Sequence, residues 1–203
     1  MVVQTPDLLV SAAPARGIGH NQGPSMDARG TWRRYAWNRA RAELLPQLPI
    51  EVVRRRVRRA GELGLDYKTY ASVRAATGRD IVALLFSSNA LRVLRQNDPL
   101  PQDRSAALQA LRQTKIRLAV APGLAPSALA ERLEAQNALH IDLATQAPHH
   151  LEAWPGLREG MARATQGVPA DGVLLIGDMS LEQVWCDAGK LAGYLPAARY
   201  FPS

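Results

Sequence analysis

The sequence predicts an α/β protein, with a basic helical module followed by a small, mainly parallel sheet of three or four strands and flanking helices. Beyond residue 80, short aliphatic runs alternate with segments of helical periodicity, as in right-handed strand–helix–strand units. Before residue 80, helical periodicity and arginine dominate. The longest aliphatic and aromatic run, residues 81–86, is too short to span a bilayer, so no membrane span is expected.

Positive charge is concentrated in the first part of the chain. Residues 1–75 contain 13 Lys and Arg against 6 Asp and Glu, whereas residues 76–203 contain 12 of each. Arginine outnumbers lysine 22 to 3 in the whole chain, a ratio that GC-rich codon usage explains. Codon usage does not explain the uneven distribution of charge, which favours an anionic partner for the basic part.

Residues 1–26 are predicted to form a flexible arm, because they are rich in Pro and Gly and have no sustained apolar period. Within this arm, residues 17–24 resemble a short element near the start of many phage- and plasmid-related bacterial proteins, which implies no activity. The arm lacks the features of a signal peptide, and a single cysteine, Cys186, precludes an intrachain disulfide. We therefore predict a cytoplasmic location.

Three helices are predicted in a basic module over residues 27–78, because apolar residues recur there at helical spacing. They are expected at 31–45, 50–63 and 67–77, with Pro49 opening the second, Gly64 ending it, Asp66 capping the third and Gly78 ending it. The second helix has one apolar stripe, formed by Ile50, Val53, Val57 and Ala60. Trp32 and Trp37 can stack on bases or pack, and their bulk favours packing.

The α/β domain is predicted over residues 79–203. Its aliphatic runs lie at 81–86, 116–121, 140–144 and 172–176. The helical segments between and after them are expected at 89–96 with 106–113, at 127–138, at 149–164 and after Ser180, where residues 180–183 match a capping box. Residues 80–96 fit a strand followed by a helix, or one continuous helix; the second alternative leaves a three-stranded sheet.

Residues 56–75 resemble the generic helix-turn-helix pattern of bacterial DNA-binding proteins. Small Ala60 lies where the two helices approach, and Gly64 lies in the tight turn. Apolar residues occupy the positions that the pattern buries, namely Leu63, Leu65, Tyr70 and Val73. The sequence departs from the pattern at Arg59, a position that is usually apolar, and at Gly61, which costs roughly 1 kcal/mol of helix propensity relative to Ala.

The resemblance implies that 67–75 is a recognition helix in the major groove. Its outward residues, expected to reach base edges or phosphates, are Lys68, Thr69, Ser72 and Arg74. The arginines of the preceding helix, expected to be exposed and to contact the phosphate backbone, are Arg54, Arg55, Arg58 and Arg59. The alternatives are a helical hairpin packed on the α/β domain with solvated arginines, and contact with an anionic membrane surface or an acidic protein.

An enzymatic or small-molecule-binding α/β domain with a helical cap is the alternative function. In open parallel sheets ligands bind beyond the carboxyl ends of the strands. The polar residues that follow the predicted strands are Ser87, Ser88, Asn89, Thr145, Gln146 and Asp178. They match no known catalytic motif and no phosphate-binding loop, so catalytic residues stay unassigned and no cofactor is expected.

The histidines do not predict a metal site. His140 with Asp142, and His149 with Glu152, each supply two ligands, which is fewer than a metal site needs. Cys186 is predicted to be a packed, unreactive thiol. The basic module and the helix-turn-helix resemblance make a nucleic-acid-binding protein the leading prediction, with DNA as the expected partner. Its role would be regulatory or associated with DNA metabolism, and the α/β domain would serve as a sensor or interaction domain. A purely structural or interaction protein is the third alternative, and the oligomeric state stays open.

Overall fold

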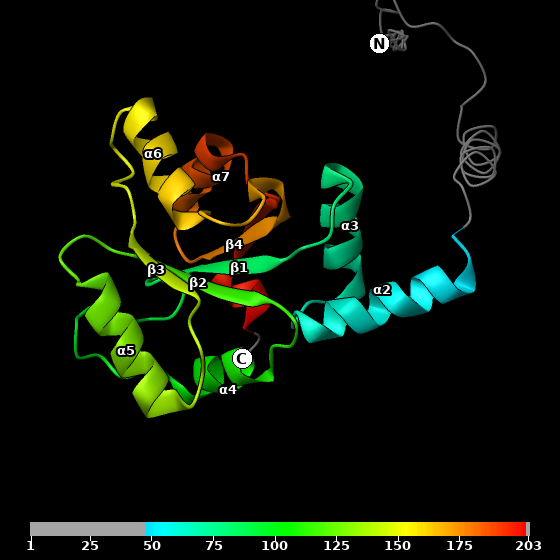
Figure 1. Ribbon diagram of the computed structural model, residues 1–203, viewed down its shortest axis with the longest axis horizontal. Coiled ribbons are helices and arrows are strands. Elements are labelled where there is room, and N and C mark those ends of the chain that lie inside the picture. The colour runs from blue at the N-terminus through cyan, green and yellow to red at the C-terminus, as the bar shows by residue number, and fades with distance from the viewer. Residues whose placement is uncertain (1–47, 202–203) are drawn as a thin grey trace, which may run out of the picture. The chain divides into compact units, whose positions relative to one another are not determined.

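The described part of the chain, residues 48–201 of a computed structural model, contains one five-stranded parallel sheet (Figure 1). The strand order is β3-β2-β1-β4-β5. The strands are β1 (Ala83–Ser87), β2 (Lys115–Val120), β3 (Leu143–Gln146), β4 (Val173–Gly177) and β5 (Gly193–Pro196). The order reverses between β1 and β4, so the sheet is doubly wound with its switch point there. The predicted arm, the helix at 31–45 and Trp32 and Trp37 lie outside the described residues.

The α/β class is confirmed, but the predicted number of three or four strands is wrong. Residues 80–96 contain strand β1, followed by turns in place of the helix expected at 89–96. The fifth strand was missed because Gly193–Pro196 contains no aliphatic run. It lies at the edge of the sheet, and Pro196, which cannot donate a ladder hydrogen bond, ends it.

Helices cover both faces of the sheet (Figure 1). One face packs against α4 (Gln102–Ala110), α5 (Pro126–Asn137) and the short α8 (Ala197–Tyr200), and the other against α6 (Trp154–Ala164) and α7 (Gln183–Gly189). Alternation along β1 explains the two cores, because Leu84 and Phe86 enter the first and Ala83 and Leu85 the second. Within residues 48–201, no helix is long and apolar enough to cross a membrane.

The predicted basic helices end within one residue of their expected positions, as α2 (Ile50–Glu62) and α3 (Tyr67–Thr77). Gly64 adopts a φ of +65° between them, and the side chain of Asp66 accepts a hydrogen bond from the Thr69 N–H. Ala60 and Tyr70 are buried in the core that packs on the sheet. The helical segment therefore shares its core with the α/β part.

The apolar stripe of α2 is buried only at its C-terminal end. Ile50 is 62% exposed and Val57 is 49% exposed, and Ala60 is the one fully buried member of the stripe. Figure 1 shows the cause, because the N-terminal end of α2 extends away from the sheet while its C-terminal end packs on the body of the domain.

A buried arginine links the sheet to α6. Arg117 of β2 is 3% exposed, and its Nη1 and Nη2 donate to the carbonyl oxygens of Ala164 and Gln166 at 2.7 and 2.9 Å. These carbonyls lie at the C-terminal end of α6, which carries partial negative charge. Burial lowers the pKa of Arg117, and the charge of Asp142 opposes that shift. The guanidinium thus caps one helix from the middle of a strand.

Tyr200 of α8 locks the turn between α2 and α3. Its hydroxyl donates to the carbonyl of Leu63 at 3.0 Å, and its ring lies edge-on to Phe86 with centroids 5.5 Å apart. A Cβ atom at Gly64 would lie 3.0 Å from this hydroxyl, so the turn needs glycine for space as well as for its positive φ. Burial raises the pKa of Tyr200 well above its ordinary value.

We predict that, at alkaline pH, the free energy of unfolding falls less steeply with rising pH in Tyr200→Phe than in the wild type. The folded state holds the Tyr200 proton more tightly than the unfolded state does. The resulting contribution to the free energy of unfolding is complete below pH ~10, the pKa of tyrosine in the unfolded chain, and is lost as the pH rises above that value. The variant should also lose about 1 kcal/mol of unfolding free energy at pH 7, because the Leu63 hydrogen bond is gone. Urea denaturation between pH 7 and 11 measures both effects, with the half-buried Tyr67→Phe as control. Equal pH slopes for Tyr200→Phe and the wild type would contradict this prediction.

Candidate functional site

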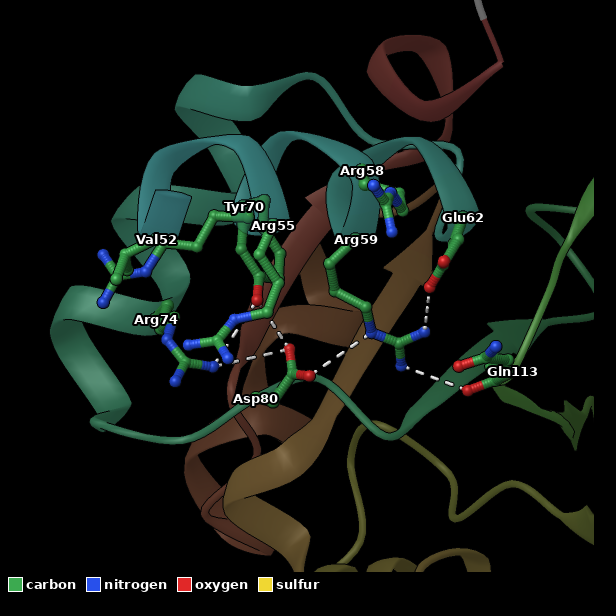
Figure 2. A pocket seen from close by; sticks show the side chains of 10 residues that line it. Val52, Arg55, Arg58, Arg59, Glu62, Tyr70, Arg74, Asp80 and Gln113 are labelled. Atoms are coloured by element: carbon green, nitrogen blue, oxygen red, sulfur yellow. Dashed lines mark hydrogen bonds and ion pairs between the residues drawn. The ribbon is translucent and has the colours of Figure 1, made fainter. Parts of the chain in front are cut away.

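Five arginines line an open cleft of about 610 Å³ between α2, α3 and the segment that leads into β1 (Figure 2). Two carboxylates, Glu62 and Asp80, share the lining, so its formal charge is +3. The remaining lining residues are Val52, Tyr70 and Gln113. The arginines are Arg55, Arg56, Arg58, Arg59 and Arg74.

Asp80 binds several polar side chains of the cleft at once (Figure 2). Its Oδ1 accepts from the Tyr70 hydroxyl at 2.7 Å, and its Oδ2 accepts from Arg59 Nε at 3.3 Å. Arg74 Nη1 lies 3.6 Å from Oδ1, which also accepts from the Ile81 N–H at 2.9 Å. Burial first, and then the hydrogen bond to Asp80, raise the pKa of Tyr70. One carboxylate therefore satisfies two arginines and a buried phenol.

Arg59 is a structural residue, and its expected exposure is wrong. Its side chain is 15% exposed. Beyond its bond to Asp80, its guanidinium donates to Glu62 Oε2 at 3.0 Å and to the carbonyl oxygens of Ile81 and Gln113 at 2.9 and 3.1 Å. These partners come from α2, from the segment just before β1 and from the loop before β2. The arginine at the usually apolar position of the helix-turn-helix pattern therefore ties α2 to the sheet.

The predicted recognition face of α3 is only partly exposed. Thr69, expected to face outward, is 8% exposed, because it donates to Asp66 Oδ2 at 2.5 Å and accepts from Arg199 Nη2 at 3.1 Å. Arg74 is half-buried and paired with Asp80. Lys68 and Ser72 are exposed, as expected. The outward surface of α3 thus presents two of the four side chains that were expected to contact bases.

The outer arginines of α2 differ from Arg59 in their partners. Arg54 is exposed and forms an ion pair with Glu51 at 2.7 Å. In residues 48–201, Arg55, Arg56 and Arg58 make no ion pair with a carboxylate. Arg54, Arg55 and Arg58 also line a second hollow of about 380 Å³. Within the described residues, α2 therefore presents three guanidinium groups without a carboxylate partner, those of Arg55, Arg56 and Arg58, toward two adjoining hollows.

The polar residues predicted at the carboxyl edge of the sheet have mainly structural partners. Ser87 Oγ accepts from the Ala90 N–H, and Ser88 Oγ from the Ala121 N–H, both at 3.0 Å. Asn89 Nδ2 donates to Glu182 Oε1 at 2.8 Å. Ser88 and Asn89 line a pocket of about 310 Å³. The pocket lining does not include Ser87, Thr145, Gln146 or Asp178.

Sequence reasoning missed four residues that line this pocket: His149, His150, Glu182 and Trp185. Glu182 lies inside the predicted capping box, but Ser180 is not its cap. The 3₁₀ turn Ser180–Glu182 precedes α7, and Glu182 Oε2 accepts from the N–H groups of Asp178 and Met179 at 2.8 and 3.2 Å. The box motif signalled a helix start, but it could not indicate a fully buried glutamate.

The other candidate residues have local hydrogen-bond partners or lie in the core. His140 Nδ1 lies 2.9 Å from Glu134 Oε1, and Asp142 Oδ2 accepts from the Ile116 N–H at 2.8 Å. Across residues 48–201, no three His, Cys, Asp or Glu side chains gather closely enough to hold a metal ion. Cys186 is buried, and burial raises the pKa of its thiol to about 12, so it is held in the unreactive protonated form.

Comparisons of the chain with protein-family models, with curated proteins and with solved structures found no match. The fold and the site define a doubly wound α/β protein with an arginine-lined cleft between two helices and the amino-terminal edge of the sheet. Its function has to be argued from the chemistry of that cleft.

We predict that Arg59 and Arg58, neighbours on α2, respond differently to replacement by Ala. Arg59→Ala should lower the unfolding free energy by about 2–4 kcal/mol, because it leaves Asp80, Glu62 and two carbonyls short of a donor. Arg58→Ala should change it by less than about 0.5 kcal/mol, because the side chain is exposed. Urea denaturation of both variants measures the difference. A similar loss in the two would show that the Arg59 contacts add no net stability.

Proposed function

We propose that this protein binds duplex nucleic acid through contacts between the arginines of α2 and the phosphate backbone. One observation carries the proposal. Arg55, Arg56 and Arg58 surround an open cleft in which the central carboxylate, Asp80, already binds Arg59 and Arg74. The remaining guanidinium groups have no internal counter-charge in the described part of the chain, so an external anion is their natural partner.

The chemistry and spacing of these side chains suit phosphate. A guanidinium group presents a planar fork of donors that matches two phosphate oxygens. Arg54 and Arg58 are separated by about 6 Å along a helix axis that rises 1.5 Å per residue. That distance corresponds to about two phosphates of one strand, at roughly 3.4 Å of duplex axis each. The outer arginines can therefore contact neighbouring phosphates, about two steps apart, on one strand.

The cleft favours a duplex over a single strand. Proteins that hold single strands usually combine positive charge with exposed aromatic rings on which bases stack. The single aromatic residue in the cleft lining, Tyr70, is 1% exposed and donates its hydroxyl to Asp80. No ring face is available in this cleft, and a base-paired backbone needs none.

The proposed contacts are with the phosphate backbone, whereas the helix-turn-helix interpretation has α3 contact base edges. With Thr69 buried and Arg74 paired with Asp80, α3 offers few side chains that can reach base edges. Contacts with the phosphate backbone fix the position of a protein on the duplex and carry no direct sequence information. The proposed binding is therefore strongly dependent on salt and weakly dependent on sequence.

We predict that replacing Arg55 and Arg58 together by Ala weakens binding to a random DNA duplex by about tenfold or more at low salt. The slope of log affinity against log salt should fall by about 1.8, since each lost phosphate contact contributes about 0.9. Fluorescence anisotropy at several salt concentrations measures both quantities.

The matched control for this double variant is Arg158→Ala with Arg163→Ala, which removes the same charge from exposed positions of α6. The control should retain the wild-type slope. If both variants lose affinity equally, net charge alone drives binding; if the wild type does not bind at low salt, the proposed function is wrong.

We also predict that Lys68→Ala and Ser72→Ala leave sequence discrimination unchanged. Each variant should weaken binding to all duplexes by less than about threefold, because at most one phosphate contact is lost. Affinities for a set of duplexes of different sequence, measured for wild type and both variants, provide the comparison. A preferred sequence that binds the wild type more than tenfold better, and loses that advantage in either variant, would restore α3 as a reading helix.

A further inference from the structure

A second concave site lies at the opposite edge of the sheet from the arginine-lined cleft. The 310 Å³ pocket is formed by loops that follow β1, β2, β3 and β4, and it includes Ser88, Pro122, Pro148 and Met179. Its position is the switch point where β1 and β4 meet, where doubly wound folds bind ligands. Its volume is at the lower end of the range of about 300–1,000 Å³ that small-molecule sites occupy.

The lining of this pocket includes a buried carboxylate, Glu182. Glu182 has no exposed surface, and its oxygens accept from three neutral donors, namely the Asn89 amide and the N–H groups of Asp178 and Met179. In residues 48–201, no Lys, Arg or His forms an ion pair with it. Buried charges are ordinarily paired, so an external cation would supply the counter-charge that Glu182 lacks within residues 48–201.

A second carboxylate, that of Asp178, belongs to a residue whose N–H donates to Glu182. The pocket lining contains no Lys or Arg, and Asp178 follows directly after β4. The nearby phenol of Tyr194 responds to this field: burial first, and then the charges of Glu182 and Asp178, raise the pKa of Tyr194 to about 12. A phosphate or carboxylate ligand would be repelled here, whereas a cation would be attracted.

The other walls are apolar and aromatic. Trp185 lies on one side, and the rings of His149 and His150 stack on each other with centroids 4.3 Å apart and planes inclined by 25°. Ala119, Ala121 and the two prolines complete the lining. Such walls bury an apolar body, and an indole ring also attracts a nearby cation through its π face.

We propose that this pocket binds a small organic cation, a protonated amine carried on an apolar body. The ammonium group lies toward Asn89 and Glu182, and the apolar part contacts Trp185, Pro148 and Met179. This site is independent of the nucleic-acid contact proposed above, because it lies at the carboxyl ends of the strands and contains none of the α2 arginines.

A pair of isosteric probes tests the charge preference. Phenethylammonium and 2-phenylethanol have the same shape and differ in charge, and phenylacetate supplies the anion. Titrations followed in ¹H–¹⁵N spectra report on the Trp185 indole N–H, assigned with Trp185→Phe. Phenethylammonium should shift that signal saturably. Its affinity should be at least about tenfold higher than that of 2-phenylethanol, because the buried carboxylate attracts its charge. Equal affinities, tighter binding of phenylacetate, or no saturable shift would overturn the proposal.

Glu182→Gln isolates the contribution of the carboxylate. If the Asn89 amide turns to present its oxygen, glutamine retains all three hydrogen bonds of Glu182 and removes only the charge. The two probes should then bind equally, whereas a retained preference for the ammonium probe would contradict the proposed role. If Glu182→Gln does not fold, Ala121→Leu fills the pocket from its rim and should weaken phenethylammonium binding about tenfold. Ala128→Leu, exposed on α5, should not; equal binding by both leucine variants would also overturn the proposal.

Discussion

The carboxylate of Asp80 determines how the two basic helices attach to the sheet. It lies just before β1 and binds a side chain from α2 and two from α3: Arg59, Tyr70 and Arg74. Without it, two half-buried or buried guanidinium groups would lose a counter-charge, and a buried phenol would lose its acceptor. Asp80 and Glu62 together neutralise the inner arginines, Arg59 and Arg74, whereas the outer arginines of α2 face the open cleft.

The arginine-lined cleft and the pocket with Glu182 lie at opposite ends of the strands. The arginine-lined cleft lies where β1 and β2 begin, next to Asp80 and Gln113, and the pocket with Glu182 lies where the strands end. Five residues of β1 separate these edges by about 17 Å, at ~3.3 Å per residue, which exceeds the screening length of about 8 Å at physiological salt. Each site therefore keeps its own electrostatic character. An anion at one edge and a cation at the other would not compete.

Local signals in the sequence were sufficient for the helices that form the cleft. Pro49, Gly64, Asp66 and Gly78 mark the ends of α2 and α3 because each acts through its own backbone geometry or cap. Each of the four aliphatic runs overlaps one strand, so local sequence was also sufficient to locate four of the five strands. Strand β5 has no such run, so only its pairing with β4 in the folded sheet reveals it.

The side chains that distinguish the sites depend on partners far away in the chain. Arg199 contacts Thr69 and so helps bury a residue that helical periodicity places on an outer face. Arg59 bonds to Gln113, and Asn89 bonds to Glu182, each across a large separation in sequence. Periodicity shows which residues share a face, but not which element later covers that face. The division of the arginines into structural and exposed groups could therefore not be read from their spacing.

The strand order has a consequence for synthesis on the ribosome. The central strand β1 pairs with β2 on one side, but its other neighbour, β4, begins at Val173, long after β1 ends at Ser87. At translation rates of about 5–20 residues per second, that edge of β1 waits roughly 4–17 s for its partner. During this interval the nascent chain carries an apolar strand with an unpaired edge, which is a template for aggregation. The edge of β1 is closed only when β4 has been synthesised and pairs with it.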